Sequence, residues 1–143
     1  MASRAAMVNG IPEVQAMFRR KAAAVISAAK AASEQGGEQV ASAMRYLAPR
    51  DQGELIRSIR VEDAETVSTA KGDRGFIGVI VKAGDATTVV TNARGGTFQN
   101  ARIQEFGTRS RAANPFFFPA YRASRTRVRG AITRAVRKAW ISG

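Results

Sequence analysis

The carboxylate of Glu105 is the first candidate for chemistry in this sequence, because it is the last acidic side chain before a long basic segment. A carboxylate beside Arg102 and Arg109 supports acid–base catalysis only when a second polar group takes part in the reaction. No such group stands out nearby, and an ion pair within the fold accounts for the same residues. We therefore interpret Glu105 as an ion-pairing residue and expect no catalytic role for it.

The residue types that are missing exclude most catalytic and metal sites. The chain contains no His and no Cys. Without His the most common general base and transition-metal ligand is absent, and without Cys there are no disulfides, thiol nucleophiles or thiolate ligands. Catalytic triads and dyads that depend on His cannot be built from this chain alone. We expect no enzyme, no cofactor and no metal site.

The charge of the chain favours an anionic partner, either nucleic acid or an acidic protein surface. The 143 residues carry 23 Lys and Arg against 11 Asp and Glu, which gives a net charge of +12. Residues 106–143 hold nine of the basic residues and no acid. The basic face that we predict on a C-terminal helix consists of Arg122, Arg125, Arg129 and Arg137.

Two segments have more specific patterns than their surroundings. The first motif, residues 48–59, is typical of a helix end, a tight turn and a strand entry, in which Asp51 bonds nearby backbone amides and Gly53 takes positive φ. In this interpretation Leu55 and Ile59 anchor the strand. The remaining residues singled out in this motif are Pro49 and Ser58.

The second motif, residues 104–120, contains a Glu-Phe-Gly-Thr box followed by three phenylalanines between two prolines. Gly107 is expected to turn with positive φ. One or two of the phenylalanines can fill the core of a small domain, and we expect at least one to pack on a neighbouring subunit. The predicted turn residues are Glu105, Phe106, Gly107 and Thr108, and the predicted interface residues are Pro115, Phe116, Phe117, Phe118 and Pro119.

The elements that position these motifs begin with an amphipathic helix that starts near residues 9–13. Apolar or small residues recur every three or four positions from Val14 through Phe18 to Leu47, which predicts one buried face. Gly36 and Gly37 interrupt this pattern at about 1 kcal/mol each relative to alanine. A kink or two successive helices therefore fits as well as one straight rod. The proline at position 49 predicts that the helix ends at residue 48.

A strand-rich middle and a second helix follow. Alternation predicts a strand over 58–62, a polar loop over 65–75 and a better-buried strand over 76–81. The strand at 76–81 and the β-rich stretch 87–91 are predicted to form a hairpin, followed by a Gly-rich loop at 92–96. Strand and short helix fit residues 98–106 equally well. The last helix is expected to start at Pro119, with an apolar face that includes Ser124, Val128, Ile132 and Trp140.

This order predicts an α+β fold with an N-terminal amphipathic helix, a mostly antiparallel sheet of three to four strands and a C-terminal basic helix. Residues 1–143 are expected to form a single domain, with residues 1–11 as a flexible N-terminal arm. Neither a membrane span nor a signal peptide is expected from the hydropathy pattern.

Taken together, the two motifs resemble those of a family of siphophage neck proteins, known as head–tail connector, head–tail joining or tail-completion proteins. The family pattern is Ala-Pro, Asp-Thr-Gly-x-Leu and Ser-Ile, then a few strands, a Glu-Phe-Gly-Thr box, Pro-Phe with a nearby Pro-Ala, and a C-terminal helix. The sequence matches both halves in order, and Gln52 stands where Thr is usual. The resemblance covers about residues 14–140.

The resemblance implies a virion protein without catalytic residues, located at the head–tail junction or the top of the tail. Such proteins are made in the bacterial host cytoplasm, and related genes occur in phages, prophages and gene transfer agents. The implied partners are further copies in a homo-oligomeric ring, sixfold or twelvefold, together with adjoining neck, portal-adaptor and tail-tube proteins. Non-specific contact with packaged DNA is compatible with the basic face.

The alternative is a free nucleic-acid-binding protein, which the net charge supports. Against it, the arginine-rich helix has no recognisable helix-turn-helix partner, and the sequence contains no zinc-finger or RNA-recognition motif. Arginines on a solvated helix face are also common.

Overall fold

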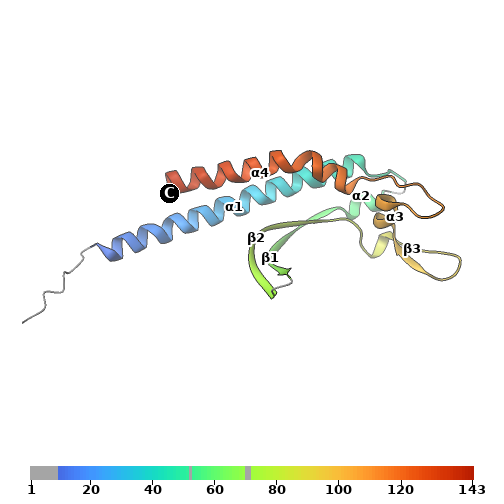
Figure 1. The fold of residues 1–143 in the computed structure, drawn as a ribbon, viewed down its shortest axis with the longest axis horizontal. Helices are drawn as coiled ribbons and strands as arrows, with labels where there is room; N and C mark the ends of the chain where they lie inside the picture. The colour runs from blue at the N-terminus through green and yellow to red at the C-terminus, as the bar shows by residue number, and fades with distance from the viewer. Residues whose placement is uncertain (1–9, 52, 70–71) are drawn as a thin grey trace, which may run out of the picture.

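The structure is a computed structural model, which describes residues 10–51, 53–69 and 72–143 (Figure 1). Two long helices, α1 and α4, lie side by side; the short helices and the smaller of two antiparallel hairpins lie near one end of this pair, and the longer hairpin runs back from there beneath α1. The elements are α1 (Ile11–Leu47), α2 (Glu54–Ser58), β1 (Arg60–Thr69), β2 (Gly72–Lys82), η1 (Ala86–Thr88), β3 (Val89–Thr91), β4 (Thr97–Gln99), α3 (Asn100–Phe106) and α4 (Phe117–Ser142). The predicted α+β class is confirmed, with the four strands divided between two sheets.

Helix α1 runs without a break through both central glycines, which decides between the alternatives in favour of one helix. It starts after Gly10, which has a φ of 99°, and a proline occupies the first turn, where its missing N–H costs nothing. It ends at Ala48, whose ψ of 140° is extended, directly before Pro49. The predicted end of the helix is therefore confirmed. The predicted flexible arm lies outside the described residues except for residues 10 and 11.

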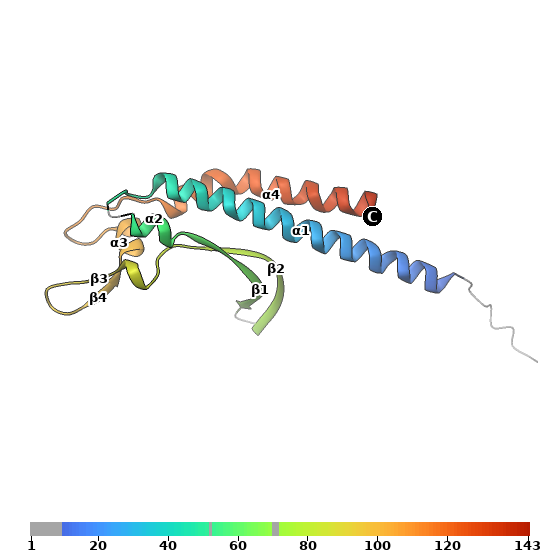
Figure 2. The same cartoon turned by 180° about the vertical axis from the view of Figure 1, so that it is seen from behind.

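Gly36 and Gly37, which interrupt the helical pattern of the sequence, are the points where other elements contact α1. A Cβ on Gly36 would collide with the side chain of Val128 in α4. A Cβ on Gly37 would lie 2.5 Å from Val79 Cγ2 in β2 and 3.1 Å from Val61 Cγ1 in β1. The absence of side chains thus lets α4 and the β1–β2 hairpin approach α1 from two sides, as Figures 1 and 2 show.

The β1–β2 hairpin differs from the strands predicted for this region. Residues 65–69 and 72–75, predicted as loop, lie in the two strands, because the register continues from Arg60 opposite Lys82 to Thr69 opposite Gly72. Backbone pairing to a neighbouring strand stabilises even a polar segment. The strand predicted over 76–81 exists, yet Phe76, Ile77 and Ile80 are exposed, so it is less buried than predicted.

The hairpin predicted between 76–81 and 87–91 is wrong. Strand β3 pairs instead with β4, from Val89 opposite Gln99 to Thr91 opposite Thr97, and the Gly-rich loop at 92–96 joins these two strands. The segment 98–106, which fitted two interpretations, contains both structures: its start belongs to β4 and the rest forms α3.

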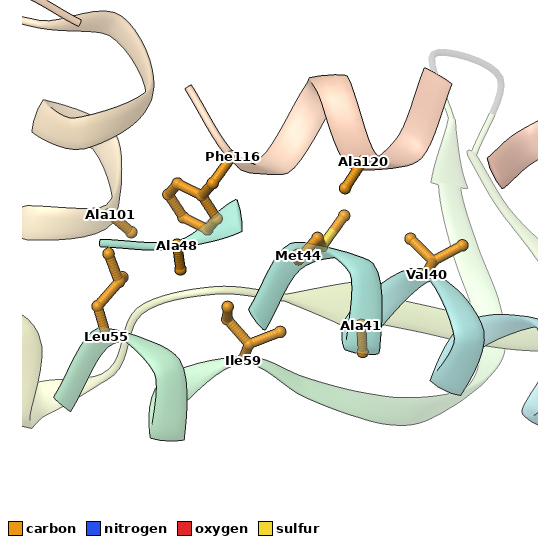
Figure 3. Packing of buried hydrophobic residues seen from close by; sticks show 9 residues of the cluster. All are labelled: Val40, Ala41, Met44, Ala48, Leu55, Ile59, Ala101, Phe116 and Ala120. Carbon is orange, nitrogen blue, oxygen red and sulfur yellow. The ribbon is translucent and has the colours of Figure 1, made fainter. Parts of the chain in front are cut away.

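Helix α4 starts two residues earlier than predicted, at Phe117, and Pro119 lies in its first turn. It runs antiparallel to α1, because Val128 lies over Gly36 whereas Lys21 contacts Trp140. The core lies where the start of α4 meets the end of α1 (Figure 3). It consists of Val40, Ala41, Met44, Ala48, Leu55, Ile59, Ala101, Phe116 and Ala120.

The first three turns of α1 depart from the predicted buried face. Every residue from 11 to 20 is exposed, including Val14 at 49% and Phe18 at 52%. The stripe has helical spacing along the whole helix, but half-buried and buried positions occur only from residue 21 onwards, where α4 lies beside α1.

Candidate functional site

Glu105 caps helix α4 from a different helix. Its side chain is buried in α3, and its carboxylate accepts hydrogen bonds from three successive backbone amides. Oε2 accepts from Phe116 N at 2.9 Å and from Phe117 N at 2.8 Å, while Oε1 accepts from Phe118 N at 3.0 Å. The first amides of a helix have no partner within the helix, and an anion there is favoured by the helix dipole. Glu105 therefore fixes where α4 starts and how it meets α3.

The ion pair predicted for Glu105 is wrong. Among the ion pairs of the described residues none includes Glu105, Arg102 or Arg109, and both arginines are exposed. The backbone amides replace the arginines because they are held at the carboxylate by the fold and need no flexible side chain to be ordered. The three amides give the carboxylate a structural role at the start of α4.

Gly107 turns the chain away from α3, as predicted, with a φ of 71°. An added Cβ would lie 2.7 Å from Ala113 N and 2.7 Å from Arg111 O, so the loop after α3 closes on this glycine. Thr108 and Arg111 exchange backbone hydrogen bonds across the loop, and Asn114 N donates to Gln104 O at 2.7 Å. The loop thereby returns to α3 and delivers Pro115, which is exposed, directly before the phenylalanines.

The first motif packs beside the second motif, near the start of α4. Gly53 has positive φ, as predicted, but it starts the short helix α2 and no strand. Leu55 is therefore buried in a helix, which corrects the predicted strand entry, and the strand starts only at Arg60. Pro49, Asp51 and Gly53 line, together with Asn100 and Arg111, a cavity of about 260 Å³ between the two motifs.

Ser58 joins α2 to the turn after β2. Its buried hydroxyl donates to Leu55 O at 2.7 Å and accepts from Gly84 N at 2.9 Å. Arg60 reinforces this link by donating to the carbonyl oxygens of Ser58 and Gly84. Hydrogen bonds from Lys82 and from this arginine hold the pKa of the Glu62 carboxyl below its usual range. Ser58 of the first motif thus has structural partners within the fold.

The phenylalanine segment changes from buried to exposed along its length. Phe116 is buried at 1% exposure, Phe117 is half-buried, and Phe118 is 43% exposed. The ring centroids of Phe118 and Phe106 are 6.1 Å apart, and Phe106 is 65% exposed. The four rings contact one another in sequence, so the core extends into an aromatic surface. Pro119 is half-buried at its edge.

An apolar groove of about 370 Å³ runs beside this aromatic surface. Its floor is α1 at the two close-packed glycines, and its walls come from β2 and α4. The lining side chains include Phe76, Val79, Phe118, Tyr121 and Ile132. No local sequence pattern indicates this groove, because its residues come from three elements whose relative placement depends on Gly36 and Gly37.

The predicted basic face is exposed on α4. Arg122, Arg125, Arg129 and Arg137 are all exposed, and none of the ion pairs among the described residues involves α4. The residues that the structure describes contain no cluster of acidic or other ligating side chains that could hold a metal ion. No helix in the described ranges is long and apolar enough to cross a bilayer.

Comparison with known proteins gave one match to a family model. Residues 13–107 match the family described as "Bacteriophage HK97-gp10, putative tail-component". The matched region includes α1, the first motif, both hairpins and Glu105 with Gly107. No curated protein and no solved structure matches the chain significantly.

Proposed function

The chain belongs to the HK97-gp10-like family of phage tail components, and from this membership we propose that it is a non-catalytic ring subunit at the head–tail junction of a phage-type virion. Membership supports a structural role in the virion, and the ring and its place at the neck are the finer part of the proposal. The neighbours in this assignment are further copies of the chain, the neck or portal-adaptor protein on the head side and the tail tube on the other.

The exposed aromatic surface supports contact between copies. Phe106, Phe118 and Tyr121 are at least 43% exposed beside an apolar groove, and such contiguous apolar surface marks interaction sites on soluble proteins. Aromatic side chains in this arrangement are typical interface anchors. If the aromatic surface of one copy meets a different surface of the next, the contact closes into a ring, for which we propose sixfold or twelvefold symmetry.

The test is to locate the chain in particles and to remove it. Immunogold electron microscopy of purified particles should place the label at the head–tail junction. Deletion of the gene should leave intact heads and intact tails that are not joined, and the wild-type gene supplied in trans should restore joining. Particles that lack the chain, or deletion mutants with normal joined particles, would refute the proposal.

A free nucleic-acid-binding protein is the second candidate, because the basic face of α4 has no acidic partner within the described residues. Fluorescence anisotropy with duplex DNA at several salt concentrations distinguishes the two. A DNA-binding protein binds at physiological salt with a steep dependence on salt. A neck protein is retained in particles whether or not the isolated chain binds DNA.

A further inference from the structure

The end of the helix pair opposite the core is both apolar and basic. We call it the helix-pair tip and define its apolar part by Ile11, Val14, Phe18, Trp140 and Ile141. All five are at least 49% exposed, and Ile141 reaches 74%. Phe18 and Trp140 contact each other with ring centroids 6.5 Å apart, so the two helices contribute to one surface.

The same tip concentrates positive charge from distant parts of the sequence. Lys21 donates to the carbonyl oxygens of Trp140 and Gly143 and lies 5.7 Å from the indole ring. On α4, Arg134, Arg137 and Lys138 line with Ile141 a shallow hollow of about 320 Å³. Because α1 and α4 run antiparallel, Lys21 near the start of α1 lies at the C-terminal end of α4, the helix that carries these basic residues.

The first turns of α1 need a covering surface. All ten residues from 11 to 20, which make about 15 Å of helix, are exposed, even though Phe18 contacts Trp140 of α4. A helical segment of ten residues is only marginally stable in water on its own, because most of the stability of helices in proteins comes from packing of an apolar face. The apolar spacing of α1 therefore extends over the whole helix, but the described residues cover it only from about residue 21 onwards.

The apolar and basic side chains of the helix-pair tip favour one class of partner over DNA and over a second copy of the tip. Phosphate groups of DNA are bound by basic and polar groups, and they offer nothing to Ile11, Val14 and Ile141. A second copy of the same tip would bring like charges together. A protein surface with an apolar groove and acidic residues at its rim complements both the apolar and the basic side chains of the tip. Aromatic residues and Arg are also the typical anchors of protein interfaces.

We infer that the helix-pair tip docks into an acidic-rimmed apolar groove on a different protein of the virion. This inference rests on the proposed function and adds to it the surface used and the chemistry of the partner. In the particle, the apolar face of α1 is covered and the basic residues of the tip face carboxylates. The aromatic surface at the other end of the molecule remains available for contacts between copies.

Photo-crosslinking in assembled particles tests the inference. A photoreactive amino acid replaces Val14 or Ile141 at the tip, or Tyr46, which is 77% exposed at the opposite end of α1, as a matched control. Mass spectrometry then identifies the adducts. Positions 14 and 141 should both crosslink to one acidic segment of a different virion protein, and position 46 should not crosslink to that segment.

Charge reversal gives an independent measurement. Arg137→Glu combined with Lys138→Glu should lower the yield of joined particles at least about tenfold, because like charges then face each other across the interface. Arg50→Glu with Arg94→Glu makes the same change in charge on exposed residues away from the tip and should leave the yield near wild type. Circular dichroism of each purified variant confirms that it folds.

The outcomes separate this inference from the proposed function. Tip adducts with DNA, with another copy of the chain, or with nothing while position 46 reacts, would overturn the docking of the tip and leave the neck assignment intact. A chain that is absent from particles would overturn both. Equal yields for the two charge-reversed variants would also contradict the inference.

Discussion

The two ends of the α1–α4 helix pair differ in their exposure to solvent: the apolar side chains are buried at one end and exposed at the other. At one end, Val40 and Met44 of α1 pack with Phe116, directly before α4, and with Ala120 of α4, and each is at most 6% exposed. At the other end, the same two helices leave Phe18 and the last aromatic residue of α4 about half exposed. Both ends have the same helical spacing of apolar residues, so amphipathic sequence alone does not decide which end is buried.

The difference arises from the elements that converge on the buried end. There α2, α3 and the loop after Gly107 surround the helix pair and close the core with Leu55 and Ala101, as Figure 3 shows. At the helix-pair tip no such element is present among the described residues. We infer that mutations at the buried end act on folding, whereas mutations at the tip act on assembly. Four measurements test this division, in order of decreasing expected effect on the free energy of unfolding.

Replacing Glu105 with Ala should have the largest effect, a loss of about 4 kcal/mol in the free energy of unfolding. Three backbone amides at the start of α4 would lose their common acceptor, and a buried space would open. Urea denaturation of the purified chain measures the loss. Glu105→Gln keeps one acceptor oxygen without the charge and should lose about half as much. Equal stability of all three proteins would contradict the capping role.

The two turn glycines should differ, although both have positive φ. Gly107→Ala should cost about 3 kcal/mol, because strain adds to the collision with the backbone of residues 111 and 113. Gly53→Ala should cost only about 1 kcal/mol, since its new Cβ meets only the end of the long Arg57 side chain and no backbone atom. Thermal and urea unfolding give both values. A larger loss in the free energy of unfolding at position 53 than at position 107 would contradict the surroundings described for the two glycines.

The helix glycines Gly37 and Gly130 should respond with opposite signs. Gly37→Ala should destabilise by about 2 kcal/mol, because its Cβ would overlap Val79 of β2. Gly130→Ala should stabilise by up to about 1 kcal/mol, because its Cβ meets only the end of the Arg134 side chain and alanine favours the helix. Calorimetry of the two variants measures this pair. A stabilising Gly37→Ala would refute the close packing of the hairpin on α1.

Neutralising the basic face should have the smallest effect on folding. Changing Arg125, Arg129 and Arg137 together to Gln should leave the isolated chain equally stable or more stable by up to about 0.5 kcal/mol. These residues have no ion pairs within the described fold, and their mutual repulsion is removed. The difference should shrink as salt is added, because salt screens exposed charges. A clear loss of stability at low salt would reveal an internal role for the arginines.

Much of the fold followed from local patterns. The end of α1 before Pro49 and the turns at Gly53 and Gly107 depend on backbone geometry that a few neighbouring residues impose. The strand pairing was harder to predict, because polar residues near the tip of the β1–β2 hairpin are held in strands by their register and not by an apolar pattern. The partner of β3 was mistaken for the same reason, since pairing is decided between strands and not within one.

The candidate site divides in the same way. The residue types of the two motifs, their order and the missing His and Cys already indicated a structural phage protein, because these are properties of the chain itself. Only the tertiary structure decided that Glu105 binds three amides instead of two arginines, and that Gly36 and Gly37 are contact points instead of a kink or a break between two helices. A carboxylate accepts hydrogen bonds from the donors that the fold places beside it, and a glycine allows the element that packs there to approach closely. Both outcomes depend on residues far away in the sequence, which local spacing does not encode.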